Sequence, residues 1–250
     1  MKRATKLRIL VLVGGVALVE LLCRVGVIGA FTMIPPSQMA TSLWRLIVTG
    51  QVHNDMVRTL TAVVIALGSS VLVGAAAGSA IHALPRVRRT VDPLLAAYYS
   101  VPVFVFYPMF IVMFGLNDIP KIVIGFLYAV AAMTINTLNG LDRVAPVYRK
   151  TSRVFRMGPA ATAFKVVLPC AAPYLFTGIK LAVAYSFIGV VGSEFILSTG
   201  GLGYKIGWAY NDFNNQTMYG LILFILGITM LVNMSLHAWE KVLLARRGLQ

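Results

Sequence analysis

The side chains that most often carry out chemistry are scarce in this sequence and lie far apart. Its three histidines, His53, His82 and His237, share no metal-binding spacing with one another or with Cys23 and Cys170. The phosphate-binding pattern G-x-x-x-x-G-K-[ST] is absent, so the chain cannot supply an ATP site. No order of serine, histidine and acid, or of cysteine and histidine, indicates nucleophilic catalysis. The sequence therefore predicts a protein that makes no covalent bonds and uses no metal or cofactor.

The most informative polar stretch is a basic segment in the second half of the chain. Residues 148–157 contain neither glycine nor proline and mix basic with apolar side chains, which predicts a short helix. Gly158 and Pro159 end this helix, residues 160–168 predict a second one, and Pro169 is expected to break it. The residues expected to act in this segment are Arg149, Lys150, Thr151, Ser152, Arg153, Phe155, Arg156, Met157, Gly158, Leu168 and Pro169.

The chemistry of this segment is that of a docking surface. Arg149, Arg153 and Arg156 are spaced so that one helical face presents all three, where they can pair with acidic groups of a partner. Basic residues also accumulate in cytoplasmic loops for topological reasons alone, which is the alternative explanation of the charge. The apolar ridge expected beside the arginines consists of Val154, Phe155 and Met157.

A second set of polar residues and helix breaks falls within apolar stretches. Such features often line a solute path through a membrane, although hydrogen bonds between helices explain them as well. For Glu194, near the outer end of its stretch, a wall of the path and a structural ion pair are both open. The candidates for the path are Ser100, Pro102, Tyr107, Asn136, Thr137 and Glu194.

The composition indicates the surroundings of these residues. Of the 250 residues, 58% are hydrophobic and only 12% are charged, and the mean hydropathy is +0.82. A soluble domain carries about 25% charged residues, so this chain cannot cover a globular surface with polar groups. Its hydrophobicity also excludes a disordered chain. We therefore predict an all-α fold, a polytopic bundle of membrane helices that forms one domain over residues 1–250.

A helix needs about 20 apolar residues to cross a bilayer, and about six stretches meet this criterion. The first is interpreted as an uncleaved membrane helix because no convincing cleavage site follows it. The loop between the fourth and fifth spans, about residues 142–173, contains the basic segment, and a loop of that length often has a function. The predicted spans are Leu10–Ala30, Leu60–Leu84, Pro93–Phe114, Lys121–Leu141, Tyr174–Leu197 and Tyr219–Trp239.

The net charge of +14 is explained by topology. With the N-terminus in the cytoplasm, sixteen lysines and arginines fall in cytoplasmic segments and five at or near the outer face. Because cytoplasmic loops accumulate basic residues, both termini are predicted to be cytoplasmic. The positive charge then requires no nucleic acid partner.

Two patterns within the spans indicate packing. Glu20 and Arg24 are four residues apart, which favours an ion pair within the first helix. Gly74 and Gly78 form a G-x-x-x-G pattern, a face of small residues that another helix can approach closely. For this pattern, packing within the chain is favoured over dimerisation.

The basic segment resembles the cytoplasmic signature of ATP-binding-cassette importer permeases, in which Glu-Ala-Ala is followed by a glycine and then by Leu-Pro. Aligned on Leu168-Pro169, the Glu-Ala-Ala positions hold Lys150-Thr151-Ser152. Arg153 matches an arginine of the signature, and the glycine position holds Arg156. Gly158, two residues later, is expected to supply the flexible point in its place.

The order of motifs from Val52 to Tyr210 resembles the nitrate, sulfonate and taurine permeases. That resemblance implies a type I importer permease in the bacterial inner membrane, which works as a homodimer with two separate ATPase subunits and a soluble or tethered substrate-binding protein. The solute would be small and anionic, and the 142–173 loop would couple closure of the ATPases to alternating access. The motifs are Arg58-Thr59-Leu60, Gly68, Gly74, Gly78, Asp92-Pro93, Ser100-Val101-Pro102, Tyr107-Pro108, Phe114-Gly115-Leu116, Asn136, Thr137, Gly140, Glu194 and Gly201-Leu202-Gly203.

Other classes of protein fit the sequence less well. An ion-coupled secondary transporter needs ionisable groups in mid-membrane, where only Glu20 and Glu194 come into question. It also favours internal repeats, and none is visible. A membrane-embedded enzyme lacks a catalytic constellation, and a scaffold leaves the 142–173 loop without a role.

Overall fold

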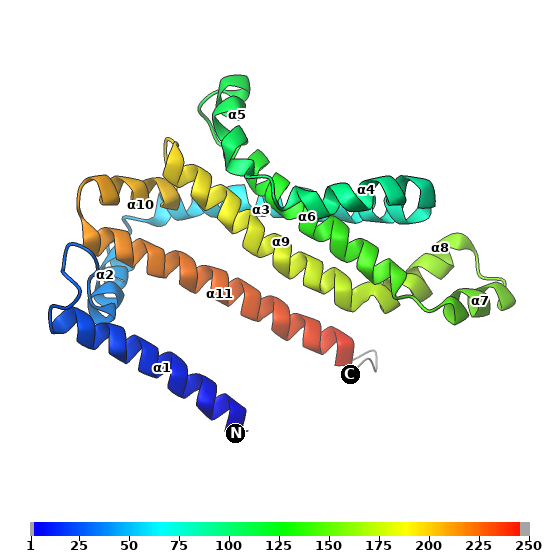
Figure 1. The fold of residues 1–250 in the computed structure, drawn as a ribbon, viewed down its shortest axis with the longest axis horizontal. Helices are drawn as coiled ribbons and strands as arrows, with labels where there is room; N and C mark the ends of the chain where they lie inside the picture. Colours follow the sequence, from blue (N-terminus) through cyan, green and yellow to red (C-terminus); the bar gives the residue numbers. More distant parts are fainter. Residues whose placement is uncertain (1–2, 246–250) are drawn as a thin grey trace.

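The computed structural model describes residues 3–245, and every regular element in that range is a helix. Figure 1 shows long helices side by side, with α7 and α8 extending beyond them at one end. The all-α prediction is confirmed. The elements are α1 (Arg3–Arg24), α2 (Pro36–Val48), α3 (His53–Ala83), α4 (Pro85–Tyr98), the 3-10 helix η1 (Val103–Phe106), α5 (Tyr107–Phe114), α6 (Ile119–Asp142), α7 (Pro146–Val154), α8 (Pro159–Thr162), the π-helical turn η2 (Ala163–Val167), α9 (Leu168–Ile196), α10 (Leu202–Asn211) and α11 (Asn215–Ala245).

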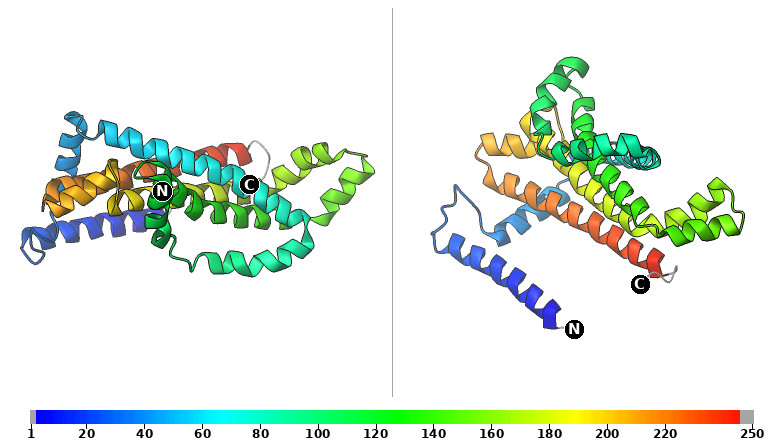
Figure 2. Two further views of the ribbon diagram at one scale, coloured as in Figure 1. Left: turned by 90° about the horizontal axis from the view of Figure 1, so that it is seen from above. Right: turned by 45° about the vertical axis from the view of Figure 1, so that its right-hand side comes forward.

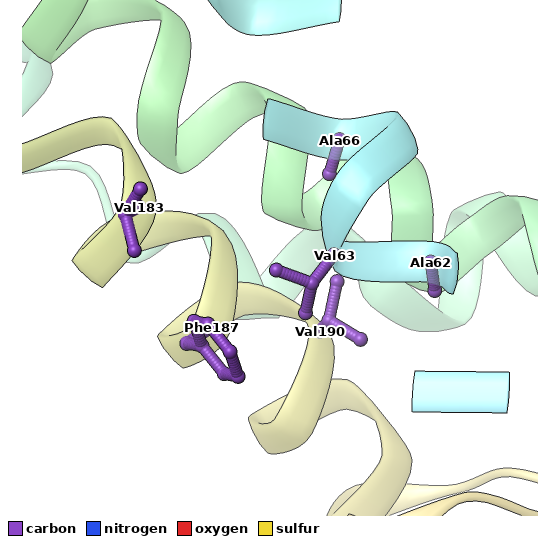
Figure 3. Close-up of a cluster of buried hydrophobic side chains, with 6 residues drawn as sticks. All are labelled: Ala62, Val63, Ala66, Val183, Phe187 and Val190. Carbon is purple, nitrogen blue, oxygen red and sulfur yellow. The ribbon is translucent and has the colours of Figure 1, made fainter. Parts of the chain in front are cut away.

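The helix α6 packs against both α3 and α9 and is the most enclosed of the apolar helices. Half of its most apolar stretch is buried, against 6% for α11, which lies along the outside of the bundle (Figure 2). α3 and α9 also meet directly. Because lipid tails are as apolar as the side chains, close packing is what holds such helices together. The residues at the contact between α3 and α9 (Figure 3) are Ala62, Val63, Ala66, Val183, Phe187 and Val190.

Gly74 and Gly78 bring α3 and α6 into close contact. A Cβ atom at Gly74 would lie 2.7 Å from Cβ of Met133, and one at Gly78 would lie 2.7 Å from Cβ of Thr137. Real Cβ atoms do not approach their neighbours so closely, so a larger residue at either position would push the helices apart. The prediction that this G-x-x-x-G pattern packs within the chain is confirmed.

Within residues 3–245, four helices are long and apolar enough to cross a membrane: α3, α6, the continuous helix Pro159–Ile196 and α11. They confirm the second, fourth, fifth and sixth predicted spans. The third is bent by 88° between α4 and Val103–Phe114, and becomes a fifth crossing if both halves count as one span. Ser100 and Pro102 lie at this bend. A proline there lacks an amide hydrogen and disfavours helix at the residue before it.

The first predicted span, Leu10–Ala30, agrees less well with the structure. α1 ends at Arg24, and every 18-residue stretch of it contains more than two charged residues, so it is not among the four apolar helices. The count of six spans is therefore not confirmed. The predicted ion pair is confirmed, because Arg24 Nε lies 2.6 Å from Glu20 Oε1. Glu20 also accepts hydrogen bonds from Ser37, which joins α1 to α2.

The side of the membrane on which the termini lie stays a prediction. Lys2, Arg246 and Arg247, which belong to the cytoplasmic set, lie outside the described residues. The basic residues predicted for a loop after the second span lie in α4 instead, because Pro85 starts that helix only one residue after α3 ends. These residues are Arg86, Arg88 and Arg89.

Pro169 does not break the helix, contrary to the prediction. α8 continues through the π turn Ala163–Val167 into α9. A proline removes one backbone hydrogen bond and its ring needs room in the preceding turn. The wider π turn directly before Pro169 accommodates both effects. α8 is therefore the beginning of one long helix through the bundle, and α7 is a separate helix before it.

Candidate functional site

α7 presents the predicted docking surface, and its two ends are set by local chemistry. Pro146 occupies the first turn, where its missing amide hydrogen costs no helical bond. At the other end, the amide of Arg156 donates to the carbonyl of Arg153 and the amide of Met157 donates to the carbonyl of Ser152, both at 2.9 Å. This pair of bonds is the Schellman motif, which closes a helix with one residue in the left-handed conformation.

Arg156 is that left-handed residue, with a φ of +53°. It stands at the glycine position of the importer-permease signature, and a side chain there costs about 1–2 kcal/mol. Gly158 has a φ of −66° and a ψ of 163°, an extended conformation that any residue adopts. The chain therefore reverses at Arg156 and not at Gly158, and the role of Gly158 as the flexible point stays a prediction.

The outward surface of α7 combines basic and apolar side chains. Val154 and Phe155 are 80% and 74% exposed. Ser152 is buried and Met157 is partly buried, so the apolar ridge has two members and not three. An apolar pair this exposed, among positive charges and with no carboxylate on the helix, is suited to bind a partner that offers acidic groups. Six of the other residues predicted to act in this segment are also exposed: Lys150, Thr151, Arg153, Arg156, Gly158 and Leu168.

Arg149 does not belong to this surface. Its side chain turns back to the bundle, where Nη2 lies 3.0 Å from Nε2 of His82 and 3.4 Å from the carbonyl oxygen of Leu141. Its Nε is buried and has no hydrogen-bond partner among residues 3–245. The predicted shared face of three arginines is wrong, because Arg149 points inward and Arg156 lies beyond the end of the helix. Only Arg153 remains on the face.

The six candidates for the solute path do not lie together. Ser100 and Pro102 are exposed at the bend that follows α4. Tyr107 is only 1% exposed, and its hydroxyl donates a hydrogen bond to the carbonyl of Leu197 at the end of α9. The first two are therefore on the surface of the bundle, and the third joins α5 to the core.

Asn136 and Thr137 lie within α6, at its contacts with two other helices. Asn136 packs against Gly178 of α9, and Thr137 packs against Gly78 of α3. Each side chain donates to a carbonyl of its own helix, four residues earlier. Their contacts in this structure are those of helix packing.

Glu194 lies in the core of the bundle, near the C-terminal end of α9, and is 1% exposed. Its Oε1 accepts from Lys121 Nζ at 2.7 Å, and its Oε2 accepts from Thr59 Oγ1 at 2.8 Å and from the amide of Gly203 at 3.0 Å. Lys121 is itself fully buried. A buried carboxylate needs an opposite charge and further donors to be tolerated. Glu194 has both, so the ion-pair interpretation describes its environment.

Charged groups continue from this pair toward the surface. Asp118 Oδ1 lies 2.9 Å from Lys121 Nζ and 2.7 Å from Arg58 Nε. Arg58 also donates to the hydroxyl of Thr199 at 2.8 Å, so the network joins α3, α6 and the turn after α9. Partial burial raises the pKa of Asp118, but the ammonium of Lys121 and the guanidinium of Arg58 outweigh it. Together they hold that pKa below its usual value of 3.8.

The glycines that follow Glu194 are required by this cluster. A Cβ atom at Gly201 would lie 2.2 Å from the carboxylate of Glu194, and one at Gly203 would lie 2.3 Å from the carbonyl oxygen of Val191. The amide of Leu202 donates to Thr59 Oγ1 at 2.8 Å. The Gly-Leu-Gly motif thus exists because the backbone folds directly over the buried carboxylate.

Sequence reasoning did not single out four residues that the structure places in ion pairs or hydrogen bonds between helices: Lys121, His82, Asp142 and Arg88. Lys121 and Arg88 counted only as topological charges, and His82 only as an isolated histidine. The sequence contained one signal of these contacts. The chain has eight carboxylates, and seven of them take part in ion pairs. In a chain so poor in acids, five of these carboxylates form ion pairs between elements: Asp55, Asp118, Asp142, Glu194 and Glu240.

Comparison with known proteins identifies relatives of most of the chain. The model of the family described as "Binding-protein-dependent transport system inner membrane component" matches residues 70–248. The taurine transport system permease protein TauC of Escherichia coli (strain K12) is 26% identical over 214 residues, which are 86% of this chain and 74% of TauC. The putative aliphatic sulfonates transport permease protein SsuC of Bacillus subtilis (strain 168) is 27% identical over 214 residues, 84% of this chain and 76% of SsuC.

Solved structures share the fold. A chain of the MetNI methionine ABC transporter, solved in inward-facing conformations, superimposes with a TM-score of 0.64 over 74% of this chain and 92% of its own length. The two sequences are 18% identical, so the likeness concerns the arrangement of the helices.

Proposed function

Because this chain belongs to the family of binding-protein-dependent transport system inner membrane components, we propose that α7 is where a separate ATPase drives the import of a small anionic solute. The chain is a permease subunit of an ABC importer, a multi-pass protein of the bacterial inner membrane. It is a transport subunit and not an enzyme, since ATP is hydrolysed by another subunit.

The observation that carries the proposal is the exposed pair Val154 and Phe155 at the end of a short helix outside the bundle (Figure 1). Apolar anchors that insert into a pocket of a partner supply most of the binding energy at protein interfaces. Arg153 and Lys150 beside them would set the orientation by pairing with acidic groups. Closure of two ATPases on ATP would then draw two such helices together and turn the permeases outward-facing.

The solute path is proposed to run between two copies of this chain. The interior of a single bundle is filled, as the contact of Gly189 with Gly125 illustrates: a Cβ atom at Gly189 would lie 2.5 Å from Cα of Gly125. Accessible polar groups occur instead on the outside, at Ser100 and the bend around Pro102. Facing copies would enclose these groups, whereas Tyr107, Asn136, Thr137 and Glu194 would support the wall from behind.

The proposed solute class comes from the relatives, which are permeases for taurine, nitrate, aliphatic sulfonates and bicarbonate. These compounds share small size and an anionic group. A substrate-binding protein would deliver the solute to the outer face.

The test of the partners is a pull-down of the tagged chain from its native membranes in mild detergent, followed by mass spectrometry. We expect a P-loop ATPase, a second copy of the chain and a soluble or tethered binding protein, whose ligand is then measured with taurine, nitrate, an alkanesulfonate and bicarbonate. Recovery of the chain alone, with solute uptake by proteoliposomes in the absence of ATP, would refute the proposal in favour of a secondary transporter.

The test of the surface is the double variant Arg153→Ala/Phe155→Ala. Loss of an anchor costs about 2 kcal/mol or more, so the ATPase should bind at least about 30-fold more weakly, with membrane insertion unchanged. The matched control is Arg45→Ala/Phe213→Ala, which removes an exposed arginine and an exposed phenylalanine at the other end of the molecule. Normal recovery of the ATPase with the first variant would rule out this assignment.

A further inference from the structure

Side chains from four helices form a continuous chain of contacts beside α7. Arg88 of α4 binds both carboxylate oxygens of Asp142, at the end of α6, each at 2.5 Å. Asp142 Oδ1 lies 3.1 Å from Nδ1 of His82, in the last turn of α3. Nε2 of the same ring lies 3.0 Å from Nη2 of Arg149 on α7. We call this set of residues, Arg88, Asp142, His82 and Arg149, the tether.

The hydrogen-bonding roles within the tether follow from its chemistry. A carboxylate only accepts hydrogen bonds and a guanidinium only donates them. Nδ1 of His82 therefore carries the hydrogen that faces Asp142, and Nε2 accepts from Arg149. This single tautomer satisfies both neighbours, so the ring bridges an anion on one helix and a cation on another.

The side chain of Arg149 is directed toward the bundle. Its Nη2 also contacts the carbonyl oxygen of Leu141, and its Nε is buried. Arg153, one turn later on the same helix, is exposed. Arg149 thus faces the bundle, and Arg153 faces outward.

The tether connects elements that the chain itself does not connect. α7 follows α6 after only residues 143–145, so a displacement of α7 reaches α6 through the backbone. His82 is 67 residues before Arg149, and Arg88 is 54 residues before Asp142. Arg149 joins α7 to α3 through His82, and Asp142 extends this connection to α4 through Arg88.

We propose that the tether transmits the displacement of α7 to α3 and α4 during transport, so that Arg149 is a positioning residue and not an ATPase contact. This inference rests on the proposed function, because it requires an ATPase that moves α7. It adds to that function the residues that pass the displacement of α7 on to the helices of the bundle.

The test uses the complete importer, the chain with its own ATPase and binding protein, in proteoliposomes. Three quantities are measured: the ATPase recovered with the permease, the rate of ATP hydrolysis, and the solute imported per ATP. For Arg149→Ala we expect normal recovery and continuing hydrolysis, with import per ATP reduced about tenfold, within the roughly 5–150-fold range of couplings between sites. His82→Ala removes the bridge while leaving Arg149 in place, and should give the same loss.

Two further variants separate transmission from a general loss of structure. The double variant Arg149→Ala/His82→Ala should be no worse than either single variant, because both interrupt one chain of contacts. His82→Gln keeps an acceptor and a donor on one side chain and should restore part of the import per ATP. The control is Arg89→Ala, which removes an exposed arginine next to Arg88 and should leave all three quantities unchanged.

The outcomes are distinguishable. Loss of the ATPase from Arg149→Ala would make Arg149 a docking residue and overturn the inference. Unchanged import per ATP in both Arg149→Ala and His82→Ala would overturn it as well, as would additive losses in the double variant. If the wild-type chain itself recovers no ATPase, the proposed function fails, and this is seen before any variant is made.

Discussion

The buried pair Lys121–Glu194 allows a quantitative prediction, because its two members do not have the same neighbours. Glu194 is bound by Lys121, by Thr59 and by the amide of Gly203, and Lys121 is also 2.9 Å from Asp118. Glu194→Gln removes one charge but leaves Lys121 paired with Asp118. Lys121→Met leaves the carboxylate of Glu194 buried with no opposite charge, so this variant should be the more damaging of the two.

The expected magnitude follows from the cost of an uncompensated buried charge. Removing one partner of a buried ion pair destabilises a protein by about 3–5 kcal/mol, whereas replacing both partners is often close to neutral. We expect Lys121→Met to lose about 4 kcal/mol by this reasoning and Glu194→Gln to lose roughly half as much. The double variant Lys121→Met/Glu194→Gln should lose less than Lys121→Met alone, because it leaves no buried carboxylate without an opposite charge.

The assay is thermal unfolding of the purified chain in detergent, followed by circular dichroism. For a chain of this size, 1 kcal/mol corresponds to a change in Tm of about 2–4 °C, so Lys121→Met should unfold about 8–16 °C below the wild type. If both single variants unfold within about 1 °C of the wild type, the change in stability is below about 1 kcal/mol. That result would refute the reasoning. Such a result would mean that water reaches the pair, and Glu194 would then become a wall of the solute path after all.

Three further predictions test the backbone and the charges around these sites. Arg156→Gly should remove the cost of a side chain in the left-handed conformation, about 1–2 kcal/mol. The more flexible unfolded chain offsets about 0.4–1 kcal/mol of this gain in stability. Hydrogen exchange at the end of α7 should therefore become slower. Gly158→Ala is its control and should change nothing, because its φ is negative and no atom lies within 4 Å of the added Cβ. Gly203→Ala should lower Tm strongly, since overpacking costs about 1–3 kcal/mol and the nearest atom is a backbone oxygen of Val191; an unchanged Tm would contradict the close approach. Asp118→Asn should lower the free energy of unfolding at neutral pH by under about 1 kcal/mol, because the pair of Asp118 with Arg58 is partly exposed. Since the pKa of Asp118 is lowered on folding, its contribution is complete above pH 3.8 and is lost as the pH falls further, so the gap between wild type and variant should close only in strong acid.

Much of the architecture could be predicted because hydropathy is a local property. The windows that contain α3, α6, α9 and α11 are apolar whatever their neighbours are, so their existence as spans did not depend on the fold. The same holds for the Glu20–Arg24 pair, whose members are one helical turn apart. The separate helix α7 was also predictable, since a proline at its start and Gly158-Pro159 after it delimit the segment.

The prediction failed where a neighbouring turn changed the conformation of a residue. Pro169 was expected to end a helix, but the π turn before it provides the space that the ring needs. Arg156 was expected on a helical face, but the closing hydrogen bonds of α7 place it in the left-handed region. Neither event has a signature in the types of the residues themselves.

What the sequence by itself determined is the class of the protein, the apolar spans and the basic segment, because these depend on composition and short-range spacing. Only the tertiary structure decided which charges meet. Lys121 is 73 residues from Glu194, and Arg149 is 67 residues from His82. Side chains so distant along the chain come together only when α3, α6 and α9 pack, and that packing depends on the fit of Gly74, Gly78 and their neighbours. The interpretation of Glu194 and the inward direction of Arg149 are therefore consequences of the folded bundle and not of its spans.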